Sequence, residues 1–147
     1  MSQTDELADW LTPLLKKLDP GQRLALAREL GRGLRQRQAE RIKNQKDPDG
    51  AAFVPRKPRP RNKTKTGPMF AQLRQYKYLK FKARTGEISV GWFSHAAHVA
   101  RIHNDGLTGT VDKKYGNETQ YPMRELLGLT DDDMDWLQDT VLDWIAR

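Results

Sequence analysis

The fold is decided by residues 19–45, which read DPGQRLALARELGRGLRQRQAERIKNQ. Asp19 followed by Pro20 is a strong helix-start signal, because the carboxylate can cap the first turn and proline suits the first helical position. Apolar residues then recur at helical spacing, so the sequence predicts a long basic helix from Pro20 to about residue 45, roughly 40 Å in length. Its apolar face comprises Leu24, Ala27, Leu30, Leu34 and Ile42.

Two glycines interrupt this helix, and another helix is expected before it. Gly31 and Gly33 weaken the long helix by about 1 kcal/mol each against alanine, so they indicate close packing or a bend. The earlier helix begins near residue 2 or 4, and Pro13 predicts a kink or a restart within it. Its apolar stripe comprises Leu7, Leu11, Leu14, Leu15 and Leu18.

The C-terminal segment predicts an acidic helix. Thr130 can cap it, and Asp131, Asp132 and Asp133 suit the positive end of the helix dipole. Apolar residues lie on more than one side, because Trp136 and Leu142 fall off the main stripe. Such a helix can contact a second chain, or both faces can pack inside one monomer. The interface residues in the first case are Trp136, Leu137, Val141 and Trp144.

The middle of the chain mixes helix and strand patterns. Residues 68–75 predict a short helix, and residues 76–84 and 88–93 predict two strands joined by a turn. Residues 95–104 predict a helix that Ser94 caps and Gly106 ends. Residues 107–120 predict a surface loop or a long hairpin. The fold class is therefore α+β, with N-terminal helices, a small antiparallel sheet crossed by a helix, and the C-terminal acidic helix.

Composition narrows the class of protein. The 147 residues carry a net charge of +7, contain no cysteine and are most simply one domain. Without cysteine the chain forms no disulfide or thiolate metal site, which suits a reducing cytosol. No segment approaches the roughly 18–20 apolar residues of a membrane span, and the acidic N-terminus is not a secretory signal. We expect a soluble cytosolic product.

Charge is strongly segregated along the chain. Residues 20–65 carry fourteen cations and four anions, whereas residues 125–147 carry one cation and seven anions. A molecule with a basic middle and an acidic tail can bind nucleic acid, or can bind copies of itself head to tail. The alternative is that the tail merely shields the middle within one fold.

Residues 46–67 form the most basic stretch, called here the arm. It opens with a turn signal at 47–50, and Pro55, Pro58 and Pro60 prevent both helix and ladder hydrogen bonding. The sequence therefore predicts an extended arm that contacts a polyanionic or acidic partner, either protein or DNA. Its cations are Arg56, Lys57, Arg59, Arg61, Lys63 and Lys65.

Patterns of catalytic chemistry are missing from the sequence. His95 and His98 can share a helix face, but no third ligand follows at a suitable spacing, so we expect no metal site. There is no nucleophile elbow, dinucleotide fingerprint or Walker-type loop, and we expect neither a cofactor nor an active site. The absence of such patterns favours a binding or assembly protein. The alternative is a small basic DNA-binding or packaging accessory protein, since the cations can neutralise phosphates.

The order of short motifs resembles that of the phage virion morphogenesis family, the tail completion proteins of contractile-tailed temperate phages. The resemblance covers nearly the whole chain. It rests on the following stretches: DPDG at 47–50, FVPRK at 53–57, MFAQL at 69–73, VARIHNDG at 99–106 and YPMRELLGLT at 121–130. The matching family-signature positions are Asp49, Gly50, Pro55, Arg56, His103, Gly106, Pro122, Arg124, Leu127 and Gly128.

The resemblance implies a structural protein made late in infection or on prophage induction. Family members finish the head-proximal end of the tail so that it can join a filled head. It implies assembly in the host cytoplasm, other tail and neck proteins as partners, and a ring of subunits in the virion, with a hexamer as the natural guess. None of the signature positions is catalytic in the family. Arg124 is expected to hold the last helix through a carboxylate or backbone carbonyls, unless it is an ordinary exposed arginine.

Overall fold

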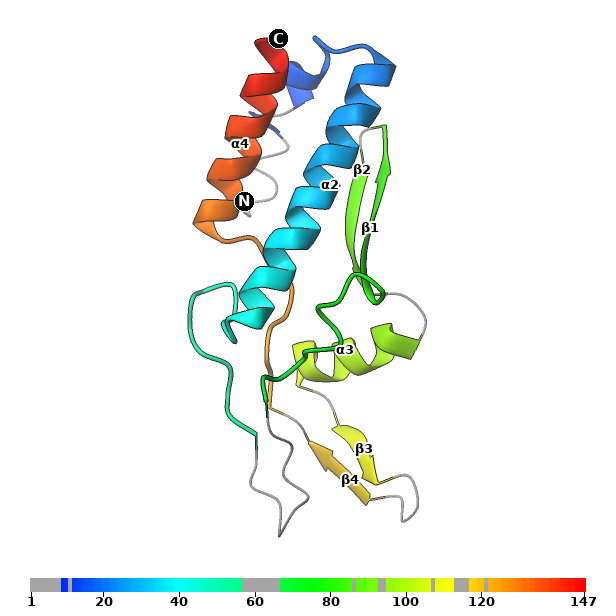
Figure 1. Cartoon of the computed structure of the whole chain (residues 1–147), viewed down its shortest axis with the longest axis vertical. Helices are drawn as coiled ribbons and strands as arrows, with labels where there is room; N and C mark the ends of the chain where they lie inside the picture. Colours follow the sequence, from blue (N-terminus) through cyan, green and yellow to red (C-terminus); the bar gives the residue numbers. More distant parts are fainter. Residues whose placement is uncertain are drawn as a thin grey trace. The chain divides into compact units, whose positions relative to one another are not determined.

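The computed structural model groups the chain into two compact units, each with its own hydrophobic core (Figure 1). The first unit comprises Met1–Arg37, Phe81–Val90 and Leu129–Arg147, and the second comprises Gln38–Lys80 and Gly91–Gly128. The residues that the structure describes are 9–10, 12–56, 67–85, 87–92, 95–106, 108–112, 117–120 and 122–147.

Helix α2 spans Pro20–Lys43 and is the predicted long basic helix. At 24 residues it is about 36 Å long. The backbone nitrogen of Gln22 donates to Asp19 Oδ1 at 2.7 Å, and the backbone nitrogen of Asp19 donates to Gln22 Oε1 at 3.1 Å. This reciprocal pair satisfies two donors at the start of the helix and confirms the start signal.

The apolar face of α2 differs in one position from the predicted stripe. Leu26, which the pattern omits, is 1% exposed, whereas Leu24 is only half-buried. Ahead of α2, residues 9–10 and 12–15 are helical, and Leu14 and Leu15 pack against the first core as predicted. Leu7 and Leu11 lie outside the described residues.

Helix α4 spans Asp131–Ile145 and is the predicted acidic C-terminal helix. Thr130 and Asp133 form a complete capping box, in which each backbone nitrogen donates to the other side chain at 3.0 Å. The second carboxylate oxygen of Asp133 accepts from Arg37 Nε at 2.6 Å. Asp133 therefore starts α4 and ties it to α2.

The first core lies where α2, α4 and the N-terminal helical residues meet. A methyl group at Gly31 would lie 2.6 Å from Phe81 Cδ2, and one at Gly33 would overlap the ring of Trp136. These two glycines therefore mark close packing of α2 against its neighbours, one of the two predicted possibilities. The buried residues are Leu18, Leu26, Leu30, Leu137 and Val141.

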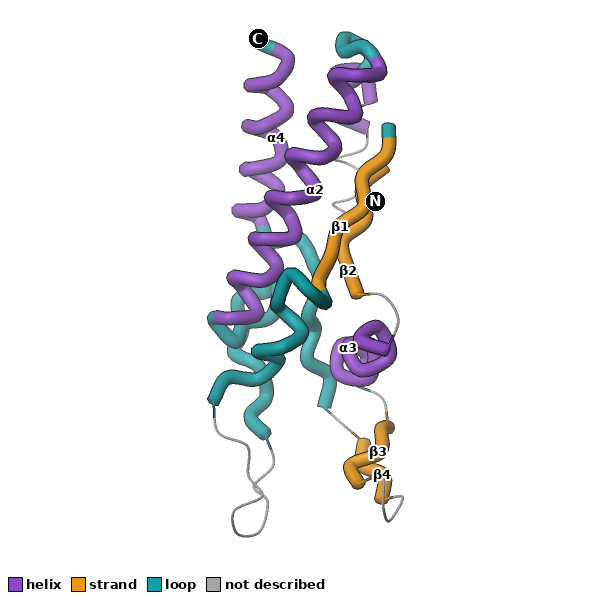
Figure 2. Tube along the Cα trace, turned by 45° about the vertical axis from the view of Figure 1, so that its right-hand side comes forward, coloured by secondary structure: helices purple, strands orange, loops and turns teal. Residues whose placement is uncertain are grey.

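Strands β1 (Leu79–Arg84) and β2 (Glu87–Trp92) pair in a two-stranded sheet. The two residues that join them make the pair an antiparallel hairpin, as predicted. Strand β1 begins three residues later than the pattern indicates, because residues 76–78 form turns. In Figures 1 and 2, α2 lies between α4 and this hairpin.

The second unit contains α3 (His95–Asp105) and a second hairpin. Gly106 follows α3 with φ of +67°, the left-handed conformation expected of a terminating glycine. Strand β3 (Thr108–Asp112) pairs antiparallel with β4 (Asn117–Gln120), so a hairpin occupies much of the stretch predicted as a loop or hairpin. The second core comprises the buried residues Ile42, Phe53, Ala100 and Leu126.

Residues 68–75 do not form the predicted helix. Residues 69–74 are turns instead, and Phe70 has a φ of +65° that a right-handed helix cannot accommodate. The apolar residues of this stretch still face inward, because Met69, Phe70 and Leu73 pack against the second core. The fold class is nevertheless the predicted α+β class.

Candidate functional site

The arm begins with a tight turn that the side chain of Asp47 holds. Its Oδ1 accepts from the backbone nitrogens of Asp49 and Ala51, each at 2.9 Å. Gly50 has a φ of +89°, which favours glycine over any residue with a Cβ. Two signature positions, Asp49 and Gly50, thus lie in the turn, but the residue that organises it is Asp47.

Arg124 is the central side chain of the site. It is only 5% exposed, and it lies in the irregular stretch between β4 and α4. Its Nε donates to the carbonyl oxygen of Val54 at 2.7 Å, and its Nη2 donates to that of Pro55 at 3.2 Å. A planar guanidinium suits two neighbouring carbonyls, because its donors point in fixed parallel directions.

The role predicted for Arg124 needs one correction. It does bind backbone carbonyls, but they belong to the start of the arm and not to the last helix. Its own backbone nitrogen donates to the carbonyl oxygen of His103 at 2.8 Å, and its Nη1 lies 3.5 Å from His103 Nδ1. Three signature positions, Pro55, His103 and Arg124, therefore meet at the start of the arm.

Arg56 closes the arm at its base. Its Nη1 donates to the carbonyl oxygen of Gly67 at 2.8 Å, and its Nη2 lies 3.3 Å from that of Pro68. Arg56 and Gly67, which flank residues 57–66, are therefore held close together. We call Arg56 and Arg124, with the four carbonyls they bind, the arm anchor. The other predicted arm cations lie outside the described residues: Lys57, Arg59, Arg61, Lys63 and Lys65.

The side chain of Gln45, two residues after the end of α2, supports the arm anchor. Gln45 Nε2 donates to the carbonyl oxygen of Met69, and the backbone nitrogen of Met69 donates to Gln45 Oε1, both at 2.8 Å. The ring of Phe70 then lies 5.5 Å from that of Phe53 and 5.0 Å from that of His103, edge to face in both pairs. The role of Gln45 is not predictable from the sequence, since no local pattern marks a glutamine for it.

Two signature glycines lie where backbone packs closely. A methyl group at Gly128 would lie 2.5 Å from Pro48 Cγ, and one at Gly106 would lie 3.0 Å from the backbone nitrogen of Met123. The buried side chain of Gln38 makes two hydrogen bonds to the backbone of Gly128. Its Nε2 donates to the carbonyl oxygen at 2.9 Å, and its Oε1 accepts from the backbone nitrogen at 3.2 Å. These contacts hold the stretch that carries Arg124.

Polar side chains that the sequence analysis did not single out complete the support of this stretch. Asn104 Oδ1 accepts from the backbone nitrogen of Leu126 at 2.8 Å, and Arg41 Nη2 donates to the carbonyl oxygen of Leu126 at 2.9 Å. Pro122 and Leu127, both signature positions, are half-buried in the same stretch. A helical residue such as Asn104 carries no local signal of a partner more than twenty positions away.

The predicted interface residues of α4 divide into two pairs. Leu137 and Val141 are buried in the first core, at 3% and 0% exposure. Trp136 and Trp144 are half-buried, and Trp144 Nε1 donates to Glu29 Oε2 at 2.5 Å. A second chain would therefore meet the edges of the two tryptophans and the exposed Leu142. The contact with a second chain remains a prediction.

The described residues suit the recognition of a binding partner. No group of three histidine, aspartate or glutamate side chains that could hold a metal ion occurs among the described residues. Within those same residues, no helix combines the length and apolar character required to cross a membrane. What the arm anchor provides is a set of hydrogen bonds that holds the residues on either side of positions 57–66.

Comparison with known proteins agrees with the order of these motifs. The profile of the phage virion morphogenesis family matches residues 2–146. The chain belongs to this family. It is also 33% identical over 152 residues to tail completion protein S of Escherichia phage P2, and the match covers the whole of both chains. No solved structure matches the chain significantly.

Family membership confirms the resemblance found in the sequence. The chain is thus a phage protein with a role in virion morphogenesis, and its relative is named for tail completion. The signature positions 55, 103 and 124 meet at the arm anchor, and positions 106 and 128 lie in the packing that supports it.

Proposed function

We propose that this protein is a non-enzymatic structural subunit that completes the head-proximal end of a phage tail and enables the tail to join a filled head. Membership of the virion morphogenesis family and the whole-length similarity to a tail completion protein support this proposal. The protein would act in the neck of the virion, after assembly in the host cytoplasm. Its partners would be other tail and neck proteins.

The arm anchor is the observation that carries the proposal. Arg56 and Arg124 bind four backbone carbonyls around the base of the arm. The side chain of Arg124 is buried. Charge-assisted hydrogen bonds of this kind are the strong ones in proteins. The hydrogen bonds hold residues 54–56 and 67–68, which flank the five further cations of the arm, and this suits docking on an acidic neighbour.

Assembly into a ring follows from the same proposal. Subunits of a ring meet through a heterologous interface, in which one surface contacts a different surface of the next copy. The segregation of charge along the chain supplies two such surfaces. A hexamer suits the sixfold symmetry that the family resemblance implies for the tail.

Neutralising the arm tests this function. The variant changes Lys57, Arg59, Arg61, Lys63 and Lys65 to Gln and keeps Arg56, because Arg56 belongs to the arm anchor. Loss of five cations should leave the thermal unfolding temperature unchanged and should leave filled heads and tails unjoined in complementation of a gene deletion. Normal phage yield from a stably folded variant would contradict the proposal.

A matched control removes the same charge elsewhere. Five cations with exposed side chains outside the arm are also changed to Gln: Lys16, Lys17, Arg28, Arg32 and Lys43. This control should support joining, because the proposal assigns the function to the arm and not to net charge. Equal loss in both variants would show that overall charge matters instead.

The second candidate function is a DNA-binding or packaging accessory protein. The cation density of the arm favours it, since phosphate binding releases counterions. It predicts a steep fall of duplex affinity with salt, with a slope of about −0.9 per phosphate contacted. Empty heads beside normal tails in the deletion would support this second candidate.

A further inference from the structure

We propose that the outward face of β1 binds the acidic side of α4 of a second copy, so that copies associate head to tail. The inference rests on the proposed ring of subunits and names the surfaces that form its interface. The occupant of the β1 face is thus a second copy of this chain, held by ion pairs.

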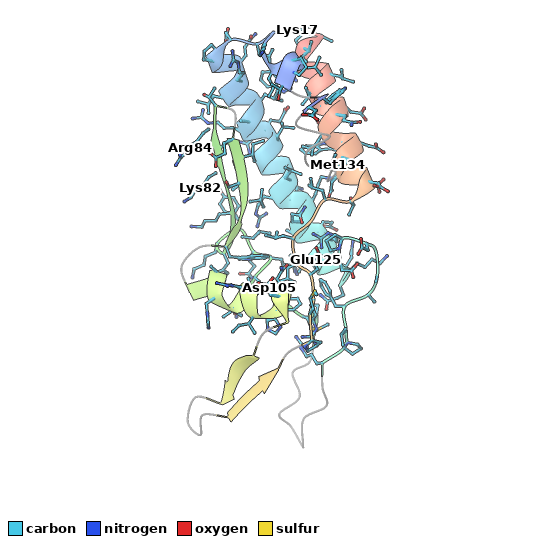
Figure 3. The ribbon with its side chains drawn as sticks, turned by 180° about the vertical axis from the view of Figure 1, so that it is seen from behind. Lys17, Lys82, Arg84, Asp105, Glu125 and Met134 are labelled. Atoms are coloured by element: carbon cyan, nitrogen blue, oxygen red, sulfur yellow. The ribbon has the colours of Figure 1, made fainter. Side chains whose placement is uncertain are left out.

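The β1 face is a row of cations. Lys80, Lys82 and Arg84 are exposed and alternate with Phe81 and Ala83, which are half-buried. Figure 3 shows Lys82 and Arg84 on the side of the hairpin that faces away from α2. Side chains two apart in a strand point the same way and are about 6.6 Å apart. The exposed Glu87 at the start of β2 lowers the local positive charge but does not lie in this row.

The acidic side of α4 is a second row of matching charge. Asp131, Asp135, Asp139 and Asp143 are all exposed and are spaced four residues apart. Residues four apart in a helix are about 6.0 Å apart along the axis and turned by about 40°, so neighbouring aspartates lie on the same side. Asp143 pairs with Arg147 at 3.2 Å, so the negative charge of the row is greatest toward the start of α4.

The two rows fit one another in spacing as well as in sign. Over two steps their repeats differ by only about 1.2 Å, which long lysine and arginine side chains can absorb. A duplex could also bind the β1 face, but it would leave the acidic row of α4 without an oppositely charged neighbour. The second copy satisfies both rows at once, whereas nucleic acid satisfies one.

Lys82, Arg84 and the acidic row of α4 all belong to the first unit, where they lie on different sides of α2. Helix α2 lies between α4 and the hairpin, with Phe81 against Gly31 on one side and Trp136 against Gly33 on the other (Figures 1 and 3). Lys82 and Arg84 therefore face away from the aspartates of their own chain. Each copy offers one basic and one acidic row on different sides, which is the arrangement a heterologous interface needs.

Charge reversal tests the pairing. One variant carries Lys82→Glu and Arg84→Glu, a second carries Asp135→Lys and Asp139→Lys, and a third carries all four changes. In complementation of a gene deletion, each double variant should lower the yield of joined particles by at least about tenfold, because two attractive pairs become repulsive. The fourfold variant should recover most of that yield, since opposite charges again face each other.

Two controls keep the result specific. Lys16→Glu with Lys17→Glu, and Glu40→Lys with Glu125→Lys, make the same charge changes at exposed positions outside both rows. They should leave the yield unchanged. The thermal unfolding temperature of every variant shows whether a loss of yield arises from misfolding, and the fourfold recovery cannot arise from that cause.

Cross-linking supplies a measurement that does not depend on yield. The chain has no cysteine, so Lys82→Cys and Asp139→Cys introduce the two thiols of the chain. Oxidation of assembled particles should then link successive copies into a series of covalent oligomers, and either single cysteine should give at most dimers. Failure to link, or to recover yield in the fourfold variant, overturns the inference.

The outcomes also separate this inference from the proposed function. If the wild-type gene restores joined particles but charge reversal has no effect, the pairing is wrong and the function stands. If the Lys82→Glu and Arg84→Glu variant loses yield and duplex binding together, with no recovery in the fourfold variant, the β1 face binds DNA and the pairing is wrong. If the wild-type gene does not restore joining, the proposed function itself fails.

Discussion

Arg124 donates a hydrogen bond of 2.7 Å from its Nε to the carbonyl oxygen of Val54, a residue 70 positions earlier in the chain. This contact joins the stretch before α4 to the first residues of the arm. Because the guanidinium is buried and always charged, its donors need partners inside the protein. The carbonyls of Val54 and Pro55 supply them, and the backbone at these two residues is held in place as a result.

Removal of the Arg124 side chain should therefore destabilise the protein. Arg124→Ala leaves two carbonyls without their donor and should lower the free energy of unfolding by about 3 kcal/mol in urea titration. Arg124→Lys keeps the charge but lacks the forked donors, so it should lose about half as much. Arg101→Ala, at an exposed position, is the matched control and should change stability by less than about 0.5 kcal/mol. Equal stability of Arg124→Ala and the control would contradict the arm anchor.

Gly128 should not tolerate a methyl group. Gly128→Ala would place its Cβ 2.5 Å from the ring of Pro48, which is rigid and cannot turn away. We expect a loss of about 1–3 kcal/mol in the free energy of unfolding. Gly91→Ala is the control, because a methyl group there meets nothing within 4 Å. A thermal melt that shows the same unfolding temperature for both variants would mean that the close approach does not exist.

Asp133 should matter far more than the aspartate beside it. Asp133→Ala removes the carboxylate half of the capping box and the 2.6 Å bond to Arg37, so it should cost about 2–3 kcal/mol. Asp132→Ala alters only an exposed residue in the first turn and should cost under about 1 kcal/mol. Guanidinium titration of the two variants measures the difference. Similar costs would indicate that the helix dipole, and not the capping box, gives Asp133 its role.

Substitution of Arg56 should affect the joining of particles more than it affects the stability of the protein. Arg56→Gln removes the contacts to Gly67 and Pro68 at a partly exposed position, so we expect a loss of only about 1 kcal/mol. The yield of joined particles should nevertheless fall, since the two ends of the arm are no longer held together. Lys46→Gln is the control, at an exposed residue that precedes the arm turn. A yield equal to that of the control would show that closure of the base has no function.

Local signals predicted the helices well. Asp19-Pro20 and Thr130 with its aspartates act through neighbouring backbone groups, so α2 and α4 begin where the sequence indicates. The hairpin of β1 and β2 follows from alternation and a short turn in the same way. By contrast, the predicted apolar face of α2 omitted Leu26, which is buried. A face defined only by helical spacing leaves out residues at the edge of a wide buried surface.

Long-range contacts account for what the sequence could not predict. Residues 69–74 have an apolar pattern that suits a helix, but Gln45 binds Met69 and Phe70 adopts a left-handed conformation. Likewise, the pattern indicated that Arg124 binds carbonyls but could not say which, because its partners lie some 70 positions away. Family resemblance identified the positions that meet at the site, but their geometry came from the structure.

The central claim is that this protein completes the head-proximal end of the tail, and deletion of its gene tests it most directly. Electron microscopy of the resulting particles should show filled heads beside separate, complete tails, and the restored protein should join them. Joined particles of normal infectivity without the protein would contradict the account, as would empty heads beside normal tails, which would indicate a role in packaging.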